Sequence, residues 1–200
     1  MEPGKIADVY PLTSYYFGSK EPKKEKDEFL SDRILRMKSN FMRDGLRRCV
    51  EGIILVEQFK HPHVLVLQVR NSFFRLPGGR LRPGETEIEG LKRKLSSKLS
   101  PDTVDPEKEW QVEECVGMWW RTGYDTIMLP YCPSHAKMPK ECLKLFLVKH
   151  SASQTLKVPK NMKLLAVPLF QLHDNAKTYG PIISSIPELL SRFSLNFICN

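Results

Sequence analysis

Residues 78–99 combine a pair of glycines with a charged helix, a spacing that could build a metal-dependent active site. Glu85 follows the glycines and Arg93 lies further along the helix. Side chains three and four apart on a helix are neighbours, and several oxygen ligands on one face are what Mg²⁺ requires. The helix face after Arg93 that carries Lys94, Ser97 and Lys98 has two ammonium groups and no carboxylate. Ammonium groups repel a dication, so we expect no metal, no cofactor and no catalytic residue here.

The helix is predicted independently of any such site. Thr86 and Glu89 have the spacing of a capping box, which starts a helix. Apolar residues then recur at helical spacing and predict a buried stripe. The stripe consists of Ile88, Leu91, Leu95 and Leu99.

The segment resembles the Nudix box, G-x5-E-x7-R-E-U-x-E-E-x-G-U, in which U is a bulky aliphatic residue. The matching residues are Gly79, Glu85, Arg93 and Leu95. The three glutamates that bind metal in the box are replaced by Lys94, Ser97 and Lys98, and its last glycine and aliphatic residue by Ser100 and Pro101. The resemblance implies a Nudix fold, while the substitutions imply that the protein is not an enzyme.

The 200 residues, 41% of them hydrophobic, suit one globular unit. Within it we expect residues 1–45 to form an N-terminal extension with a helix, and residues 46–200 to form the Nudix-like domain. The net charge is +8, and residues 61–100 form a basic stretch, with eight Lys and Arg against three acidic residues. Basic surfaces attract phosphate-bearing partners.

The five cysteines form no C-x-x-C pair, which argues against a disulfide framework and a zinc site. No apolar run approaches the ~20 residues of a membrane span, and the first residues lack the apolar stretch of a secretory signal. We therefore expect a soluble intracellular protein with no membrane partner.

Mixed strands and helices predict an α/β sheet covered by helices on both faces, with N- and C-terminal extensions. Residues 9–18 should be extended, 20–28 a loop, and 29–45 a helix. Apolar β-branched runs predict strands at 49–56 and 64–69, joined by a solvated turn at His61-Pro62-His63. Further strands are expected at 112–120, 126–131, 143–149 and 164–168. Tyr179-Gly180-Pro181 has the composition of a turn, and Ser185 with Pro187 predicts a helix start.

Beyond the box, much of the chain resembles the small Nudix-fold subunit of pre-mRNA cleavage factor I, a eukaryotic 3′-end processing factor. The matching segments are 9–18, 47–52, 73–79, 84–93, 166–170 and 180–193. The resemblance implies a nuclear homodimer that binds single-stranded RNA containing UGUA, without hydrolysis. It also implies a larger cleavage factor I subunit with an RNA-recognition motif as partner, and poly(A) polymerase and other 3′-end processing factors beyond it.

The resemblance also implies a set of RNA-binding residues: Glu25, Arg33, Glu51, Ser72, Phe73, Leu76, Tyr179 and Gly180. Readout of single-stranded RNA needs a flat group for stacking and fixed donors and acceptors against base edges. Phe73 is the expected stacking group, with Phe74 pointing to the opposite face of the same strand. An arginine can donate to base carbonyl oxygens and a carboxylate can accept from an imino N–H. Leu76 is expected to contribute through its backbone.

Two other functions compete with RNA binding. The first is a Nudix pyrophosphohydrolase whose ligands have moved to other carboxylates. The candidate ligands are Glu85, Glu87, Glu89, Glu113 and Glu114. The second is binding of a dinucleoside polyphosphate without cleavage.

Overall fold

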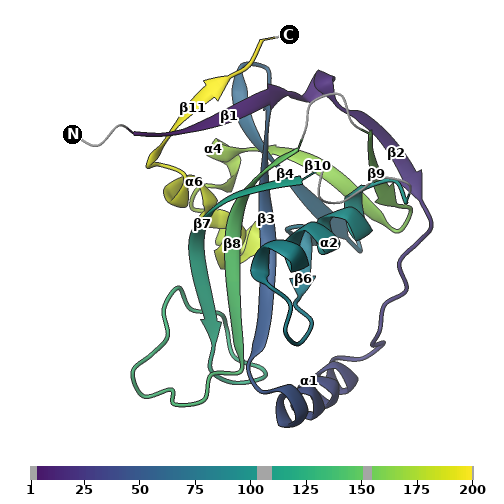
Figure 1. The fold of residues 1–200 in the computed structure, drawn as a ribbon, viewed down its shortest axis with the longest axis vertical. Coiled ribbons are helices and arrows are strands. Elements are labelled where there is room, and N and C mark those ends of the chain that lie inside the picture. The colour runs from purple at the N-terminus through teal and green to yellow at the C-terminus, as the bar shows by residue number, and fades with distance from the viewer. Residues whose placement is uncertain (1–3, 103–109, 151–154, 200) are drawn as a thin grey trace.

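The computed structural model describes residues 4–102, 110–150 and 155–199, and a large mixed sheet forms its centre (Figure 1). The strands of this sheet are β1 (Lys5–Pro11), β3 (Arg47–Gln58), β4 (His61–Val69), β5 (Phe73–Arg75), β6 (Gly78–Arg80), β7 (Trp110–Arg121), β8 (Glu141–His150), β10 (Met162–Pro168) and β11 (Phe193–Phe197). A second, two-stranded sheet pairs β2 (Tyr16–Lys20) with β9 (Thr155–Pro159). The helices are the 3₁₀ turn η1 (Leu12–Ser14), then α1 (Leu30–Asp44), α2 (Glu87–Leu99), α4 (Leu169–Leu172), α5 (Ala176–Ser184) and α6 (Ile186–Leu189).

Strand β3 organises the large sheet because four other strands pair with it. It runs antiparallel to β4 and β6, and parallel to β8 and β1. Glu51, near the middle of β3, lies opposite Gly78 on β6 and Leu145 on β8. The residue is therefore held on both sides by other strands.

Helices cover both faces of the sheet, as the α/β interpretation predicted (Figure 1). Successive residues of a strand point to opposite faces. Accordingly Ile54 lies in the cluster with Leu91 and Leu95 of α2, while Ile53 lies in the cluster with Ile186 of α6. Each fully buried aliphatic side chain contributes about 1.5–3 kcal/mol through burial. The two clusters thus fix α2 on one face and α4 to α6 on the other.

The helices expected at 29–45 and after Thr86 are confirmed as α1 and α2. At the start of α2 the Thr86 hydroxyl accepts from the Glu89 N–H at 3.3 Å, and the Glu89 carboxylate accepts from the Thr86 N–H at 3.2 Å. The expected stripe is buried except at Ile88, which is 49% exposed. Ile88 lies in the first turn and borders an open depression beside Arg48, so its inclusion in the stripe was wrong.

The turn between β3 and β4 lies earlier than the sequence predicted. Phe59 and Lys60 form it with φ of 53° and 63°, and β4 already begins at His61. The expected solvated turn at His61-Pro62-His63 was therefore wrong. His63 is 5% exposed within β4, and its Nδ1 atom lies 2.9 Å from the His61 carbonyl oxygen.

The strands expected at 112–120, 143–149 and 164–168 are confirmed as β7, β8 and β10. The strand expected at 126–131 was wrong, since in that range only a single bridge between Leu129 and Trp120 forms. Thr126 is instead part of a local turn, its hydroxyl accepting from the Gly123 N–H at 3.0 Å, and Pro130 has no N–H to extend a ladder.

Residues 179–181 do not form an isolated turn but lie within α5. Gly180, with φ of 84° and ψ of 165°, interrupts the helix there. The helix start predicted from Ser185 and Pro187 is confirmed as the short α6. No helix in the described part of the chain has the length and apolar character that crossing a membrane requires.

Candidate functional site

The glycine-rich segment forms β6, which pairs directly along β3, and Gly78 makes this close approach possible. A Cβ atom on Gly78 would lie 2.1 Å from the Val50 carbonyl oxygen and 2.6 Å from the Glu51 Cα atom. Only glycine leaves the room that backbone needs at this distance. The Gly52 N–H also donates to the Pro77 carbonyl oxygen at 2.9 Å. The loop is therefore held against Glu51 by the main chain.

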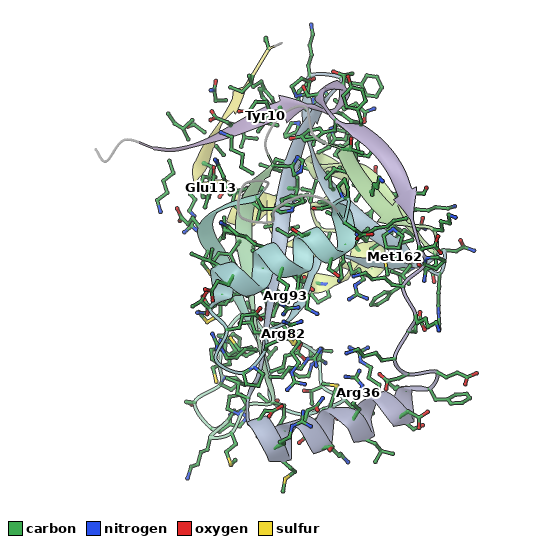
Figure 2. The ribbon with its side chains drawn as sticks, turned by 45° about the vertical axis from the view of Figure 1, so that its right-hand side comes forward. Tyr10, Arg36, Arg82, Arg93, Glu113 and Met162 are labelled. Atoms are coloured by element: carbon green, nitrogen blue, oxygen red, sulfur yellow. The ribbon has the colours of Figure 1, made fainter. Side chains whose placement is uncertain are left out.

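Glu85 and Arg93 fasten the loop to α2. Nε of Arg93 donates to one Glu85 oxygen at 2.6 Å and Nη2 donates to the other at 2.8 Å, while the Arg82 N–H donates to the second oxygen at 2.8 Å. Hydrogen bonding by Arg93 is the main reason that the pKa of Glu85 falls to about 2. Figure 2 shows Arg82 and Arg93 in the part of the molecule between α2 and α1. Because both oxygens of Glu85 are engaged, this carboxylate acts as a clamp on the loop.

The face of α2 that carries metal ligands in the Nudix box carries cations here. Lys98 is only 7% exposed, and half-buried Lys94 lies 3.1–3.3 Å from where a Gly79 Cβ would be. Burial lowers the pKa of both ammonium groups, that of Lys98 to about 7. Within the described ranges, no group of three or more His, Cys, Asp and Glu side chains is arranged to hold a metal ion.

Three of the other carboxylates considered as displaced ligands, Glu87, Glu89 and Glu114, have structural partners. The Glu87 carboxylate lies 2.6 Å from the Lys144 ammonium, and Glu89 completes the capping box of α2. On β7, the Glu114 carboxylate lies 2.6 Å from the Lys5 ammonium. The two ion pairs link α2 to β8 and β7 to β1.

Glu51 is the half-buried carboxyl group beside this cationic face. Burial raises its pKa to about 7, and the positive charges of Lys98 and Arg75 oppose that rise. Near neutral pH the group can therefore accept a hydrogen bond as a carboxylate or donate one as an acid. Both properties suit contact with the edge of a base.

The two neighbouring phenylalanines of β5 differ in exposure, as predicted from the alternation of side chains between the two faces of a strand. Phe73 is 58% exposed, whereas half-buried Phe74 packs on Tyr179 with ring centroids 4.8 Å apart. The Tyr179 hydroxyl accepts from Nε2 of Gln171 at 2.6 Å. Leu76 is 1% exposed as a whole residue, so both its side chain and its backbone are buried in this structure. Phe73 is the open aromatic ring of this region.

Two further predicted residues lie beside the β4–β5 turn. Glu25 forms an ion pair with Arg70 in that turn. The Ser72 hydroxyl donates to the Arg70 carbonyl oxygen at 3.4 Å. The structure thus brings Glu25 and Ser72 to the turn that leads into Phe73, although they lie far apart in sequence.

Gly180 and Arg33 have different surroundings. Helix α5 packs against β5, and a Cβ atom on Gly180 would meet nothing within 4 Å, so this glycine borders open space. Arg33 lies on α1, where Arg47, Arg121 and Glu141 are its main charged neighbours and burial lowers its pKa. The charged neighbours of Arg33 include none of the other predicted site residues, although Glu141 is a charged neighbour of both Arg33 and Glu51.

The structure adds two basic residues that the sequence reasoning missed. Arg75 follows Phe73 by two residues on the same strand, so the period of a strand already indicated a shared face. Lys23 lies in the 20–28 loop. Its N–H donates to Oδ1 of Asn161 at 3.1 Å, and its carbonyl oxygen accepts from Nδ2 of Asn161 at 2.7 Å. No local sequence signal predicts that contact.

Comparison with known proteins places the chain in a family. A family model described as nucleotide hydrolase, NUDIX_2, matches residues 5–193. The chain is 62% identical over 193 residues to pre-mRNA cleavage factor Im 25 kDa subunit 1 of Arabidopsis thaliana, an alignment that covers 96% of this chain and 87% of the relative. It is 54% identical to subunit 2 of the same factor from that plant, over 99% of both chains. It is 46% identical to cleavage and polyadenylation specificity factor subunit 5 of Dictyostelium discoideum, over 93% of this chain and 92% of the relative.

The family model spans most of the chain, including β1, the loop over β3, α2 and α6. The relatives match almost their full length, and all three have names from mRNA 3′-end processing. The chain therefore belongs to the Nudix family and, within it, to the 25 kDa subunits of pre-mRNA cleavage factor Im.

Proposed function

We propose that the protein is a catalytically inactive subunit of pre-mRNA cleavage factor I that binds the UGUA element of single-stranded RNA. The observation that carries the proposal is the exposed ring of Phe73 on β5, the strand whose Arg75 is a charged neighbour of the half-buried carboxyl group of Glu51. Stacking of a base on an aromatic ring contributes about 1–3 kcal/mol, and a fixed carboxyl group distinguishes base edges. Together they supply the two elements that readout of an unpaired base requires.

Each predicted site residue has a role in this proposal. Phe73 stacks on a base, and Glu51 and Glu25 accept imino N–H groups. Arg33 donates to base carbonyl oxygens from α1. The remaining residues shape the pocket around the bases through backbone, hydroxyl and ring groups: Ser72, Leu76, Tyr179 and Gly180.

The absence of hydrolysis follows from the chemistry of the box. Lys94 and Lys98 place ammonium groups where a Nudix enzyme holds its dication, and Glu85 is clamped by Arg93. A dication on this face would have to approach the ammonium groups of Lys94 and Lys98, which is unfavourable. A pyrophosphohydrolase is therefore disfavoured, although the chain matches a family model described as nucleotide hydrolase.

The assembly that we propose for the protein is the one that its resemblance to the small cleavage factor I subunit implies. It acts in the nucleus as a homodimer, together with a larger cleavage factor I subunit that carries an RNA-recognition motif. Poly(A) polymerase and other 3′-end processing factors are further partners. Sedimentation of the purified chain and its co-purification with the larger subunit test these proposals directly.

RNA binding and hydrolysis can be tested on one preparation. Fluorescence-labelled RNA containing UGUA is titrated with protein, alongside a scrambled RNA of equal length. The same protein is incubated with Mg²⁺ and a panel of nucleoside and dinucleoside polyphosphates, and released phosphate is measured. We expect preference for UGUA and no turnover; Mg²⁺-dependent hydrolysis without RNA preference would reject the proposal.

A further inference from the structure

Four basic side chains from α2, β5 and the 20–28 loop are electrostatic neighbours of one another, and two of them, Arg75 and Lys98, also of Glu51. The four are Lys23, Arg75, Lys94 and Lys98. Lys98 has the positive charges of Lys23, Arg75 and Lys94 among its main electrostatic neighbours, and Lys23 has those of Lys20, Arg75 and Lys94. The family resemblance assigned none of these four residues a role in RNA binding.

The cluster has more positive than negative charge. Lys98 is 7% exposed, and among the described residues the one carboxylate among its main electrostatic neighbours is Glu51. For Lys23 the corresponding carboxylate is Asp102. Lysine is rarely this buried unless it is paired, because removing an ammonium group from water is unfavourable. An anion bound among these groups would therefore be strongly stabilised.

The positions of the four residues are fixed by other parts of the fold. Asn161 holds the backbone of Lys23 through two hydrogen bonds of 3.1 and 2.7 Å, and the Lys23 ammonium contacts the Ser97 hydroxyl on α2. Lys94 lies over Gly79 of the loop. The cations are therefore already gathered in the unbound protein, which lowers the entropic cost of binding an anion.

Arg75 connects this cluster to the exposed aromatic ring. Phe73 and Arg75 are two residues apart on β5, so their side chains point to the same face of the strand, while Phe74 packs into the core on Tyr179. A nucleotide whose base stacks on Phe73 would thus extend its sugar and phosphate along the face that bears Arg75.

We propose that Lys23, Arg75, Lys94 and Lys98 form a phosphate-binding site that holds a backbone phosphate of the RNA next to the base on Phe73. This inference rests on the proposed RNA-binding function and assigns a role to the face that replaced the metal ligands. Phosphate contacts position a nucleic acid without reading its sequence. The site should therefore raise affinity for any RNA and leave the preference for UGUA unchanged.

Salt dependence of binding measures phosphate contacts. The variants are Lys98→Met, which keeps an apolar stem in the buried position, and Arg75→Gln. Lys137→Gln, in the exposed connection between β7 and β8, removes the same charge as a control. For single strands the slope of log K against log salt becomes shallower by about 0.7 for each phosphate that the protein no longer neutralises. We expect that change and about tenfold weaker binding at low salt for each site variant, and neither for the control.

Two outcomes separate this inference from the proposed function. If the wild-type protein shows no preference for UGUA over scrambled RNA, the proposed function fails. If that preference is present but both site variants keep the wild-type slope and affinity, the phosphate site is rejected while the function stands. Thermal melting of each variant verifies folding, and Lys94→Gln, at a half-buried position, replaces Lys98→Met if that variant melts below the assay temperature.

A phosphate could come from RNA or from a free nucleotide, and a second measurement distinguishes these sources. RNAs with a neutral methylphosphonate at single linkages around UGUA should lose affinity at one linkage in the wild type and show no further loss in Arg75→Gln. Inorganic tripolyphosphate is tested separately for thermal stabilisation of the protein. If it stabilises the wild type but not the variants, while no methylphosphonate has an effect, the RNA backbone is excluded as the ligand.

Discussion

Replacing each of the two adjacent phenylalanines of β5 with alanine should separate RNA binding from stability. Phe73 is 58% exposed, so Phe73→Ala should change the free energy of unfolding by no more than about 0.5 kcal/mol. The same change removes the stacking surface, worth about 1–3 kcal/mol, and should weaken UGUA binding by about 5- to 150-fold. Phe74→Ala, in contrast, should lower the stability of the protein. It empties a half-buried position against Tyr179 and should cost about 2–4 kcal/mol of unfolding free energy.

The assay is urea denaturation combined with fluorescence anisotropy of a UGUA RNA. Phe59→Ala is the control for loss of an exposed ring, since Phe59 is 81% exposed in the β3–β4 turn. It should affect neither quantity by more than experimental error. Unchanged RNA affinity in Phe73→Ala, with stability also unchanged, would refute the assignment of Phe73 as the stacking group.

Three further changes test the loop and the box. Glu85→Gln should lower the free energy of unfolding by about 1.5–3 kcal/mol at pH 7. The pKa of Glu85 in the folded protein, about 2, lies below the ordinary value of 4.5. The extra stability of the wild type is therefore complete above pH 4.5 and is lost as the pH falls through 2. A difference in unfolding free energy between wild type and variant that stays constant between pH 7 and pH 3 would contradict this reasoning. Gly78→Ala should lower the free energy of unfolding by about 3 kcal/mol, because the new Cβ atom would lie 2.1 Å from a backbone oxygen. A loss of less than about 1 kcal/mol in urea denaturation would show that the loop moves to accommodate the methyl group. Lys94→Glu with Ser97→Glu and Lys98→Glu should bind Mn²⁺ in calorimetry but hydrolyse no nucleotide, since carboxylates alone do not position a substrate; turnover by this variant would contradict the loss of substrate positioning.

The elements that the sequence predicted well are those with local signals. The Thr86 and Glu89 capping box and the leucine period fixed α2, and β-branched apolar runs fixed β3 and β4. The alternation of Phe73 and Phe74 followed from strand geometry alone. In each case the residues that decide the structure lie within a few positions of one another.

Other features depended on contacts between distant residues. The pairing of β2 with β9 joins Tyr16 to Thr155, and β1 pairs with the short β11 near the other end of the chain. The contact of Glu25 with Arg70 and the burial of Lys98 likewise arise only when separate elements meet. The burial of Lys98 could not be predicted from its residue type, because lysine is normally exposed.

The histidines near the β3–β4 hairpin show the limit of turn composition as a predictor. Proline between two histidines favours a turn, yet the tight turn forms at Phe59 and Lys60 with positive φ at both residues. The pairing of β3 with β4 determined the position, since Val64 must lie opposite Leu55 to keep both in the core. Sheet register thus overrode the local preference.

The most direct test of UGUA recognition is a competition measurement at two salt concentrations. Labelled UGUA RNA bound to the protein is displaced by unlabelled UGUA or scrambled RNA at about 50 mM and about 200 mM salt. Base readout predicts that both affinities fall with salt while UGUA keeps an advantage of roughly 100-fold at both concentrations. Equal displacement by the two RNAs at both salt concentrations would show that the protein attracts phosphate without reading bases, and would contradict the proposed function.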